Sequence, residues 1–392
     1  MRIGIPAERD PHETRAAASP ASVKKLVGLG ATVVVEAGLG SRCQWSDAEF
    51  SEAGASLSSD RQEILSNSDL LLQVRPPAAS DLAAMARGTI CISYLDPFNS
   101  SELVEQAAAA GVSAISLEMI PRTTLAQKMD ALSSQHSLAG YYMVILAAER
   151  LAKILPMMTT PAGTIQPSRV FVIGAGVAGL QAIATAKRLG ARVDAFDTRP
   201  EVEEQVKSLG GRFVKIDLGE TGSTNQGYAT QLSEDQLAKQ REGMRQQCAV
   251  SDIVITTAQL FGRKAPVVIT KEMLSSMRPG SVVVDYAVES GGNVEGSRPG
   301  EEVDIDGVKV IGLRNYPGQV AQSASQMLAN NFANMIQHFW DKESKAMALR
   351  REDEILAGCL VTHGGEIVNP VIRKHYGLPE LAAAAKPEGA SA

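Results

Sequence analysis

A glycine-rich segment near the middle of the chain constrains the fold most strongly. The apolar run 169–173 is followed at once by Gly174, Gly176 and Gly179, which have the spacing G-x-G-x-x-G. A helix-like stretch continues from there to residue 189, and a second apolar strand ends at Asp197, 18 residues beyond Gly179. This order predicts the dinucleotide-binding unit of a Rossmann fold, in which a strand, a glycine loop, a helix, a second strand and an acid follow one another at this spacing.

Each component of this segment has a physical reason. We expect Gly174 to permit the tight turn, Gly176 to let the backbone approach a pyrophosphate, and Gly179 to let the helix pack close to the strand. The helix N-terminus offers N–H groups to the phosphates. The residues predicted to contact a dinucleotide here are Gly174, Ala175, Gly176, Val177, Gly179, Asp197, Thr198 and Arg199. The alternative is a glycine-rich turn with no ligand.

The acid at the end of the second strand predicts which dinucleotide binds. A carboxylate at Asp197 would accept hydrogen bonds from the adenosine ribose and would repel a 2′-phosphate, so we expect NAD(H) and not NADP(H). Arg199 weakens this inference, because an arginine at this place accommodates a 2′-phosphate.

The rest of the chain repeats the same alternation of strands and helices. Apolar strand-like blocks separated by helices predict parallel sheets that are covered on both faces. We therefore expect an α/β fold with two Rossmann-like domains, joined by two long linking helices near 134–155 and 322–340, with a cleft between the domains. The predicted domains are 1–135 together with 325–392, and 136–324.

Composition excludes several classes of function. The 392 residues include 38 Lys and Arg, 44 Asp and Glu, and only 4% aromatics, so the chain lacks the basic, aromatic character of a nucleic-acid binder. The four cysteines form no C-x-x-C pair and the five histidines form no cluster with ligand spacing, so we expect no metal. We find no signal-peptide pattern and no run of about 18 apolar residues, and we therefore expect a soluble, cytoplasmic protein.

Four segments together resemble one known family. Residues 176–191 (GVAGLQAIATAKRLGA), 121–135 (PRTTLAQKMDALSSQ), 284–293 (VDYAVESGGN) and 314–321 (RNYPGQVA) are similar to the NAD(H)-binding component of proton-translocating NAD(P) transhydrogenases, in the alanine dehydrogenase/transhydrogenase family. The resemblance covers nearly the whole chain. It implies that this chain passes hydride from NADH to NADP+ held on a partner subunit, and that membrane-spanning subunits couple the transfer to proton translocation.

The resemblance also assigns roles to residues. It implies that Arg122, Gln127, Asp130 and Ser133 form a polar loop around the nicotinamide. Without the family, Asp130 and Ser133 would suit a helix cap equally well. The resemblance further makes residues 219–228 a mobile loop that closes over NAD(H), with Gly227 and Tyr228 at its end, and Gln259 follows a strand at the ligand-binding edge of the sheet.

A hydride transfer between two nicotinamides sets a simple chemical requirement. It needs close, dry positioning of two carbons and no general acid or base. The resemblance further implies a homodimer that is peripheral to the inner membrane through its partner subunits.

Two alternatives remain open. The first is an NAD-dependent alanine dehydrogenase, whose substrate lysine, catalytic histidine and aspartate align with Gln73, Asp96 and Glu289. These departures leave Arg15 as the obvious cation for a carboxylate substrate. Transhydrogenases commonly have lysine at position 73 as well, so that difference does not discriminate. The second alternative is a non-catalytic NAD(H)-binding module, against which Arg122 and Gln127 argue.

Overall fold

The chain divides into two compact units in the computed structural model, which describes residues 1–219, 221–222 and 233–381. The first unit comprises residues 1–9, 16–130 and 328–392, and the second comprises residues 10–15 and 131–327. The sequence predicted boundaries at 135/136 and 324/325, and it placed the whole N-terminal stretch in the first domain. The contacts instead place segments 10–15, 131–135 and 325–327 in the second unit.

The first unit is built on a six-stranded, wholly parallel sheet in the order β3-β2-β1-β4-β5-β6. Its strands are β1 (Arg2–Ile5), β2 (Thr32–Glu36), β3 (Ser56–Ser58), β4 (Leu70–Leu72), β5 (Ile90–Ser93) and β6 (Ser113–Ser116). The helices between them are α1 (Pro20–Gly28), α2 (Asp47–Glu52), α3 (Arg61–Ser66), α4 (Ala79–Ala84) and α5 (Ser101–Ala109). β4, β5 and β6 are buried along their whole length, as expected for a sheet covered on both faces.

The C-terminal segment completes the first unit. It contains β16 (Trp340–Asp341), β17 (Ala346–Met347), α12 (Glu354–Cys359), β18 (Thr362–His363), β19 (Glu366–Ile367) and α13 (Pro370–His375). β18 lies beside β6, where the Thr362 hydroxyl donates to Val112 O and accepts from Ala114 N. The predicted return of the chain to the first domain after the second long helix is therefore observed.

The second unit contains the Rossmann sheet that the glycine segment predicts. Its order is β11-β10-β9-β12-β13-β15-β14, parallel except for the antiparallel edge strand β14. The strands are β9 (Arg169–Ile173), β10 (Arg192–Phe196), β11 (Arg212–Phe213), β12 (Ile253–Thr256), β13 (Val282–Asp285), β14 (Glu301–Ile305) and β15 (Val308–Gly312). Counted from β9, the parallel strands have the 3-2-1-4-5-6 order of dinucleotide-binding folds.

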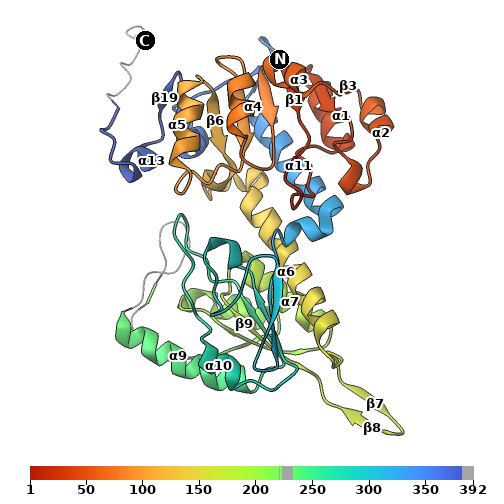
Figure 1. Cartoon of the computed structure of the whole chain (residues 1–392), viewed down its shortest axis with the longest axis vertical. Helices are drawn as coiled ribbons and strands as arrows, with labels where there is room; N and C mark the ends of the chain where they lie inside the picture. The colour runs from red at the N-terminus through yellow and green to blue at the C-terminus, as the bar shows by residue number, and fades with distance from the viewer. Residues whose placement is uncertain (220, 223–232, 382–392) are drawn as a thin grey trace. The chain divides into compact units, whose positions relative to one another are not determined.

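Alternate residues of the central strand serve opposite faces of this sheet. Val170 and Val172 pack with α6 (Ala131–Arg150) and α7 (Val177–Arg188), whereas Phe171 and Ile173 pack with α9 (Glu234–Ala249) and α10 (Lys271–Ser275). Figure 1 shows α9 and α10 beside each other, away from α7. The predicted fold class, an α/β chain with two largely parallel sheets, is confirmed.

The two long helices differ in length from the prediction. α6 begins at Ala131 and ends at Arg150, and α11 (Ala321–His338) follows the short turn η6 (Pro317–Val320). Residues 151–155 are not helical, although the sequence predicted helix to 155. The chain instead runs into a hairpin, β7 (Met158–Thr160) and β8 (Gly163–Ile165), which projects from the second unit in Figure 1.

Membrane-spanning helices are not found among the described residues: none of their helices is both long and apolar enough to cross a bilayer.

Candidate functional site

The glycine loop between β9 and α7 has the close geometry that its sequence predicts. Gly174 has φ +92°, a left-handed conformation that side chains disfavour, and a Cβ there would lie 2.7 Å from the Thr257 hydroxyl. A Cβ on Gly179 would lie 1.8 Å from the Gly174 carbonyl oxygen. The first glycine therefore makes the turn, and the third lets α7 approach the end of β9.

The middle glycine of the loop has little around it in the described part of the chain. A Cβ on Gly176 would have one neighbour there within 4 Å, the Arg199 guanidinium, at 3.9 Å. Gly176 is also the N-cap of α7, and no described side chain caps the helix. The N-terminal N–H groups of α7 are thus placed to receive an anion, and the absence of a Cβ lets that anion approach the backbone.

Asp197, which directly follows β10, lies against this loop. Its Oδ2 accepts a hydrogen bond from Ala175 N at 2.7 Å, and the side chain is 5% exposed. Arg199 occupies the rest of the carboxylate through Nε and N to Oδ1, both at 2.9 Å, and through Nη2 to Oδ2 at 2.7 Å. These four bonds match the roughly four acceptor positions of a carboxylate.

The same contacts define the state of Arg199. Its hydrogen bond to Asp197 raises the pKa of the guanidinium, and its charge is compensated by its neighbour. Thr198 lies between the two, and its carbonyl oxygen accepts from the Thr221 hydroxyl. In this arrangement Arg199 is bonded to Asp197. The sequence alone left open whether Arg199 accommodates a 2′-phosphate, and this pairing argues against that role.

Two residues that the sequence analysis did not select hold the neighbouring loop. Thr257 follows β12 and donates from its hydroxyl to Gly174 O at 3.0 Å. Asn293, fully buried, accepts from Ala258 N at 3.0 Å and donates to Ala258 O and Pro266 O at 2.8 Å. Gln259, half-buried, is in the loop that Asn293 fixes at both ends.

Asp285 explains why Asn293 is held in place. Its carboxylate accepts from the backbone N–H groups of Ala287, Asn293 and Val294. Burial raises the pKa of Asp285. The motif 284–293 is therefore a scaffold for the Gln259 loop. The Gly-Gly-Asn end of the motif is the sequence feature that could have identified Asn293. Gly291 and Gly292 have positive φ and turn the backbone, and the Asn293 side chain then bonds to that loop.

The second group of predicted site residues lies in the first unit, on the loop between β6 and α6. Ala126 and Met129 are fully buried, and Lys128 O accepts from Asn331 and Asn334 of α11 at 3.1 and 2.9 Å. This anchoring leaves Arg122 and Gln127 exposed, with Gln127 opening a short turn, η3 (Gln127–Met129). The loop is thus a fixed platform for polar side chains.

The remaining predicted residues fall in different regions of the chain. Asp130 is half-buried and directly precedes α6, while Ser133 lies in the first turn of α6, in the second unit. Gly227 and Tyr228 lie outside the described residues. The structure thus brings together the glycine loop, Asp197, Thr198 and Arg199 in one unit, and Arg122, Gln127 and Asp130 on one loop of the other.

A buried polar network contains the cation Arg15. Arg15 donates to both carboxylate oxygens of Glu13, at 2.8 and 2.7 Å, and to Gln135 Oε1 at 3.0 Å. Gln135 donates in turn to Ala324 O, and Asn315 donates to Glu13 at 3.1 Å. These bonds tie segment 10–15 to α6 and α11, which is why it belongs to the second unit.

The same network sets the ionisation of Glu13. Burial alone would raise the pKa of this carboxyl, but the charge of Arg15 and hydrogen bonds from Arg15 and Asn315 outweigh burial and lower it. Glu13 is therefore an ionised partner of Arg15, and each charge compensates the other within the protein.

Positions 73, 96 and 289 hold no cation and no imidazole. Gln73 is 3% exposed, and Asp96, at φ +45°, accepts from Asn99 Nδ2 within its own turn. Glu289 accepts from Asn315 N at 3.1 Å. No group of three His, Cys, Asp or Glu side chains suited to a metal is found in the described portion of the chain.

Comparisons with known proteins agree with one another. Two family models match: "Alanine dehydrogenase/PNT, N-terminal domain" over residues 4–139 and "Alanine dehydrogenase/PNT, C-terminal domain" over residues 143–370. The chain is 44% identical to an NAD(P) transhydrogenase alpha-subunit polypeptide of Rhodospirillum rubrum, over 95% of this chain and 99% of that protein.

A solved structure and a second branch complete the comparison. The structure of transhydrogenase from Sinorhizobium meliloti matches with a TM-score of 0.82 and 41% identity, over 95% of this chain and all of that one. An alanine dehydrogenase of Halomonas elongata is 30% identical, over 98% of this chain and 99% of that protein.

Proposed function

Because the chain belongs to the alanine dehydrogenase/PNT family, we propose that it is the NAD(H)-binding component of a proton-translocating NAD(P) transhydrogenase. It would pass hydride from NADH to NADP+ bound on a partner subunit, while membrane-spanning partners couple that step to proton movement. One observation supports the proposal most strongly. The dinucleotide loop is intact, whereas Arg15, the cation that an oxo-acid substrate would need, is already paired with Glu13.

The glycine loop fits NAD(H). Gly176 leaves open the space above the loop, and the uncapped start of α7 supplies N–H groups for a pyrophosphate. When bound, NADH supplies the hydride. Asp197 would accept from the adenosine ribose once Arg199 yields one of its bonds, and Arg199, while paired with Asp197, carries no free charge for a 2′-phosphate. Both points favour NAD(H) over NADP(H).

The loop residues of the first unit would complete the site. A guanidinium at Arg122 suits a phosphate or amide oxygen, and Gln127 suits a carboxamide, with Asp130 and Ser133 orienting them. Gln259, on the loop held by Asn293, would line the dinucleotide edge, as would Gly227 and Tyr228. We propose that these residues meet at one nicotinamide, in a cleft between the two domains.

The alanine dehydrogenase alternative needs groups that the chain uses otherwise. An oxo-acid substrate requires a cation for its carboxylate and an acid for its carbonyl. Arg15 forms a buried ion pair with Glu13, and Asp96, at the position of the dehydrogenase histidine, is a carboxylate bonded in its own turn. These observations favour the transhydrogenase over the dehydrogenase.

A two-step assay tests the proposal. The purified chain, with NADH binding first verified by fluorescence, is supplied with pyruvate and ammonium, and we expect no NADH oxidation. The same chain is then mixed with an NADP(H)-binding partner subunit loaded with the thionicotinamide analogue of NADP+, whose reduced form absorbs apart from NADH. We expect reduction of the analogue. Turnover with pyruvate would instead identify an alanine dehydrogenase, and failure of both assays would leave a binding module.

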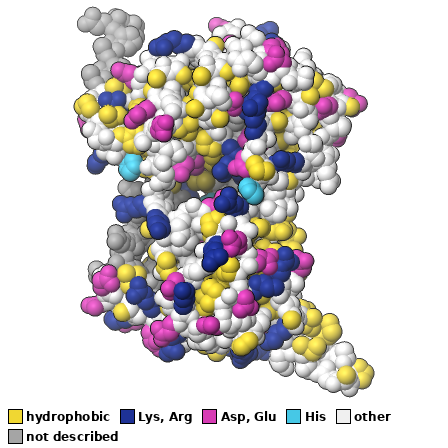
Figure 2. Space-filling view, viewed as in Figure 1, with side chains coloured by type: hydrophobic (Ala, Val, Ile, Leu, Met, Phe, Trp, Pro, Cys, Tyr) yellow, Lys and Arg dark blue, Asp and Glu magenta, His cyan; other side chains and the backbone are white. Residues whose placement is uncertain are grey.

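We also propose a homodimer, attached to the cytoplasmic side of the inner membrane through its partners. The β7–β8 hairpin supports self-association. Isolated two-stranded hairpins are marginal in water, yet this one carries Met157 and Met158 with 63% and 46% of their surface exposed. Figure 2 shows hydrophobic atoms along this projection.

A further inference from the structure

A cavity opens at the edge of the Rossmann sheet opposite the glycine loop. Its volume is about 930 Å³, within the range of small-molecule sites. The polar part of its lining includes Lys153, Ser168, Arg169, Arg192, Asp252 and Arg278. Arg169 and Arg192 are the first residues of β9 and β10, whereas the glycine loop follows the last residue of β9, roughly 16 Å away along a five-residue strand.

Three exposed arginines line this cavity. Arg169 and Arg192 are partners in the parallel register of β9 and β10, a pairing that places like charges on neighbouring strands. Arg278 comes from the segment before β13. Among the residues that the structure describes, none of these three side chains has a hydrogen-bond or ion-pair partner.

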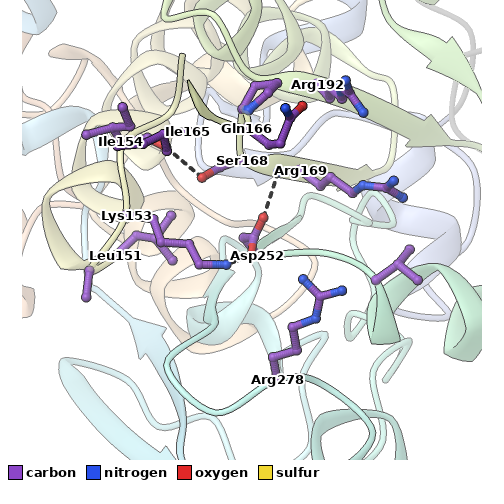
Figure 3. Close-up of a pocket in the computed structure, with 13 residues that line it drawn as sticks. Leu151, Lys153, Ile154, Ile165, Gln166, Ser168, Arg169, Arg192, Asp252 and Arg278 are labelled. Atoms are coloured by element: carbon purple, nitrogen blue, oxygen red, sulfur yellow. Dashed lines mark hydrogen bonds and ion pairs between the residues drawn. The ribbon is translucent and has the colours of Figure 1, made fainter. Parts of the chain in front are cut away.

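The one carboxylate in the lining does not neutralise them. Asp252, 8% exposed, accepts from Lys153 Nζ at 2.6 Å and from the backbone N–H of Arg169 at 2.9 Å. Figure 3 shows Asp252 at the centre of the view, with Lys153 reaching it. The Asp252 carboxylate is thus paired with Lys153 and with a backbone N–H, and the three arginines give the cavity a net positive charge.

The cavity also has an apolar wall. Leu151, Ile154, Pro167 and Val250 line it beside the exposed amide of Gln166, which has no partner among the described residues. Arginine forks match phosphate oxygens, an apolar wall suits a flat base, and a free amide can bond to a base edge.

We propose that this cavity is a second ligand site that binds a nucleoside polyphosphate, separate from the dinucleotide loop. The arginines would hold the phosphates, and the apolar wall with Gln166 would hold the base. The site is independent of the hydride reaction, because it lies at the amino ends of the strands and the reaction belongs to their carboxyl ends.

Calorimetry on the full chain saturated with NADH tests this site, because the dinucleotide loop is then blocked. The probes are ATP, inorganic tripolyphosphate and adenosine. We expect ATP to bind more tightly than tripolyphosphate, with binding that weakens as salt is raised, and adenosine to give no measurable heat. Equal affinity for ATP and tripolyphosphate would overturn the nucleoside assignment, and no ATP heat would overturn the site.

Matched variants locate the binding. Arg192→Gln and Arg278→Gln should each weaken ATP binding about tenfold or more, with NADH affinity unchanged. Arg241→Gln is the control, since Arg241 is exposed on α9, lies outside the lining and also lacks a partner among the described residues. An equal loss in Arg241→Gln would show diffuse charge attraction and contradict the proposal. Competition between ATP and NADH would do the same, by assigning ATP to the glycine loop.

Discussion

At the scale of single residues, Asp197 and Arg199 act as one unit. The Asp197 carboxylate is 5% exposed, and Ala175 and Arg199 occupy all its acceptor positions. A ribose hydroxyl can therefore bond to Asp197 only by replacing one of these hydrogen bonds. The sequence predicted Asp197 from spacing and named Arg199 as an opposing influence. It could not show that the two are bonded to each other, because that depends on side-chain geometry.

Asp197→Ala tests this pairing. We expect weaker NADH binding and a gain in NADPH binding, because a guanidinium that no longer bonds to Asp197 can meet a 2′-phosphate. The double variant Asp197→Ala/Arg199→Ala should lose the NADPH gain while keeping the NADH defect. Binding of both dinucleotides is measured by fluorescence titration. If the single variant keeps the wild-type selectivity, Asp197 has no role in ribose recognition.

Gly179→Ala tests the close approach of α7 to β9. Its Cβ would lie 1.8 Å from Gly174 O, so the helix has to shift, and we expect a loss of about 1–3 kcal/mol in the free energy of unfolding. Gly28→Ala is the control: it lies at the end of α1 with no atom of the described residues within 4 Å of the new Cβ, and alanine is the better helix former. Urea titration compares the two, and equal stabilities would contradict the packing argument.

Glu13 gives the chain a pH dependence. Its pKa is lowered in the folded protein, so its stabilising effect is present above the ordinary value of 4.5 and is lost as pH falls through the lower folded value. Glu13→Gln should therefore lose less stability than the wild type as the pH falls from about 5 to about 3. Unfolding by urea at several pH values measures this. Glu52→Gln, at an exposed position, should leave the wild-type pH slope unchanged.

At the scale of elements, prediction succeeded where the signal is local. The strand from 169 to 173, the glycine turn after it and the helix from 177 follow from an apolar run and the glycine spacing, and all three are present. The prediction failed where partners lie far along the chain. The hairpin strands are only three residues long, and the edge strand β14 carries three acidic residues among its five. Segment 10–15 is placed by Gln135 and Asn315, over 100 residues away.

Asn293 anchors the 258–266 segment, and its removal tests how that element is held. Asn293→Ala leaves three polar groups of the 258–266 segment without a partner, so we expect a loss of about 2–4 kcal/mol in the free energy of unfolding. Hydrogen exchange at Ala258 N–H should become faster. Thr257 N–H, which bonds to Ile173 O, is the internal control and should exchange as before. Equal protection of Ala258 in both proteins would remove Asn293 from its anchoring role.

At the scale of the whole molecule, the exposed apolar hairpin predicts how the chain exists in solution. Met157 and Met158 present apolar surface that a monomer would leave in water, and an association that buries it is favourable at roughly 25 cal/mol per Å². We expect Met157→Glu together with Met158→Glu to shift the chain from dimer to monomer, because each buried interface would then hold unpaired carboxylates. Sedimentation velocity over a range of concentrations measures the change. Leu378→Glu, at another exposed apolar side chain, should leave the dimer intact. A wild-type chain that sediments as a monomer at all concentrations would require the hairpin to be covered by a different partner.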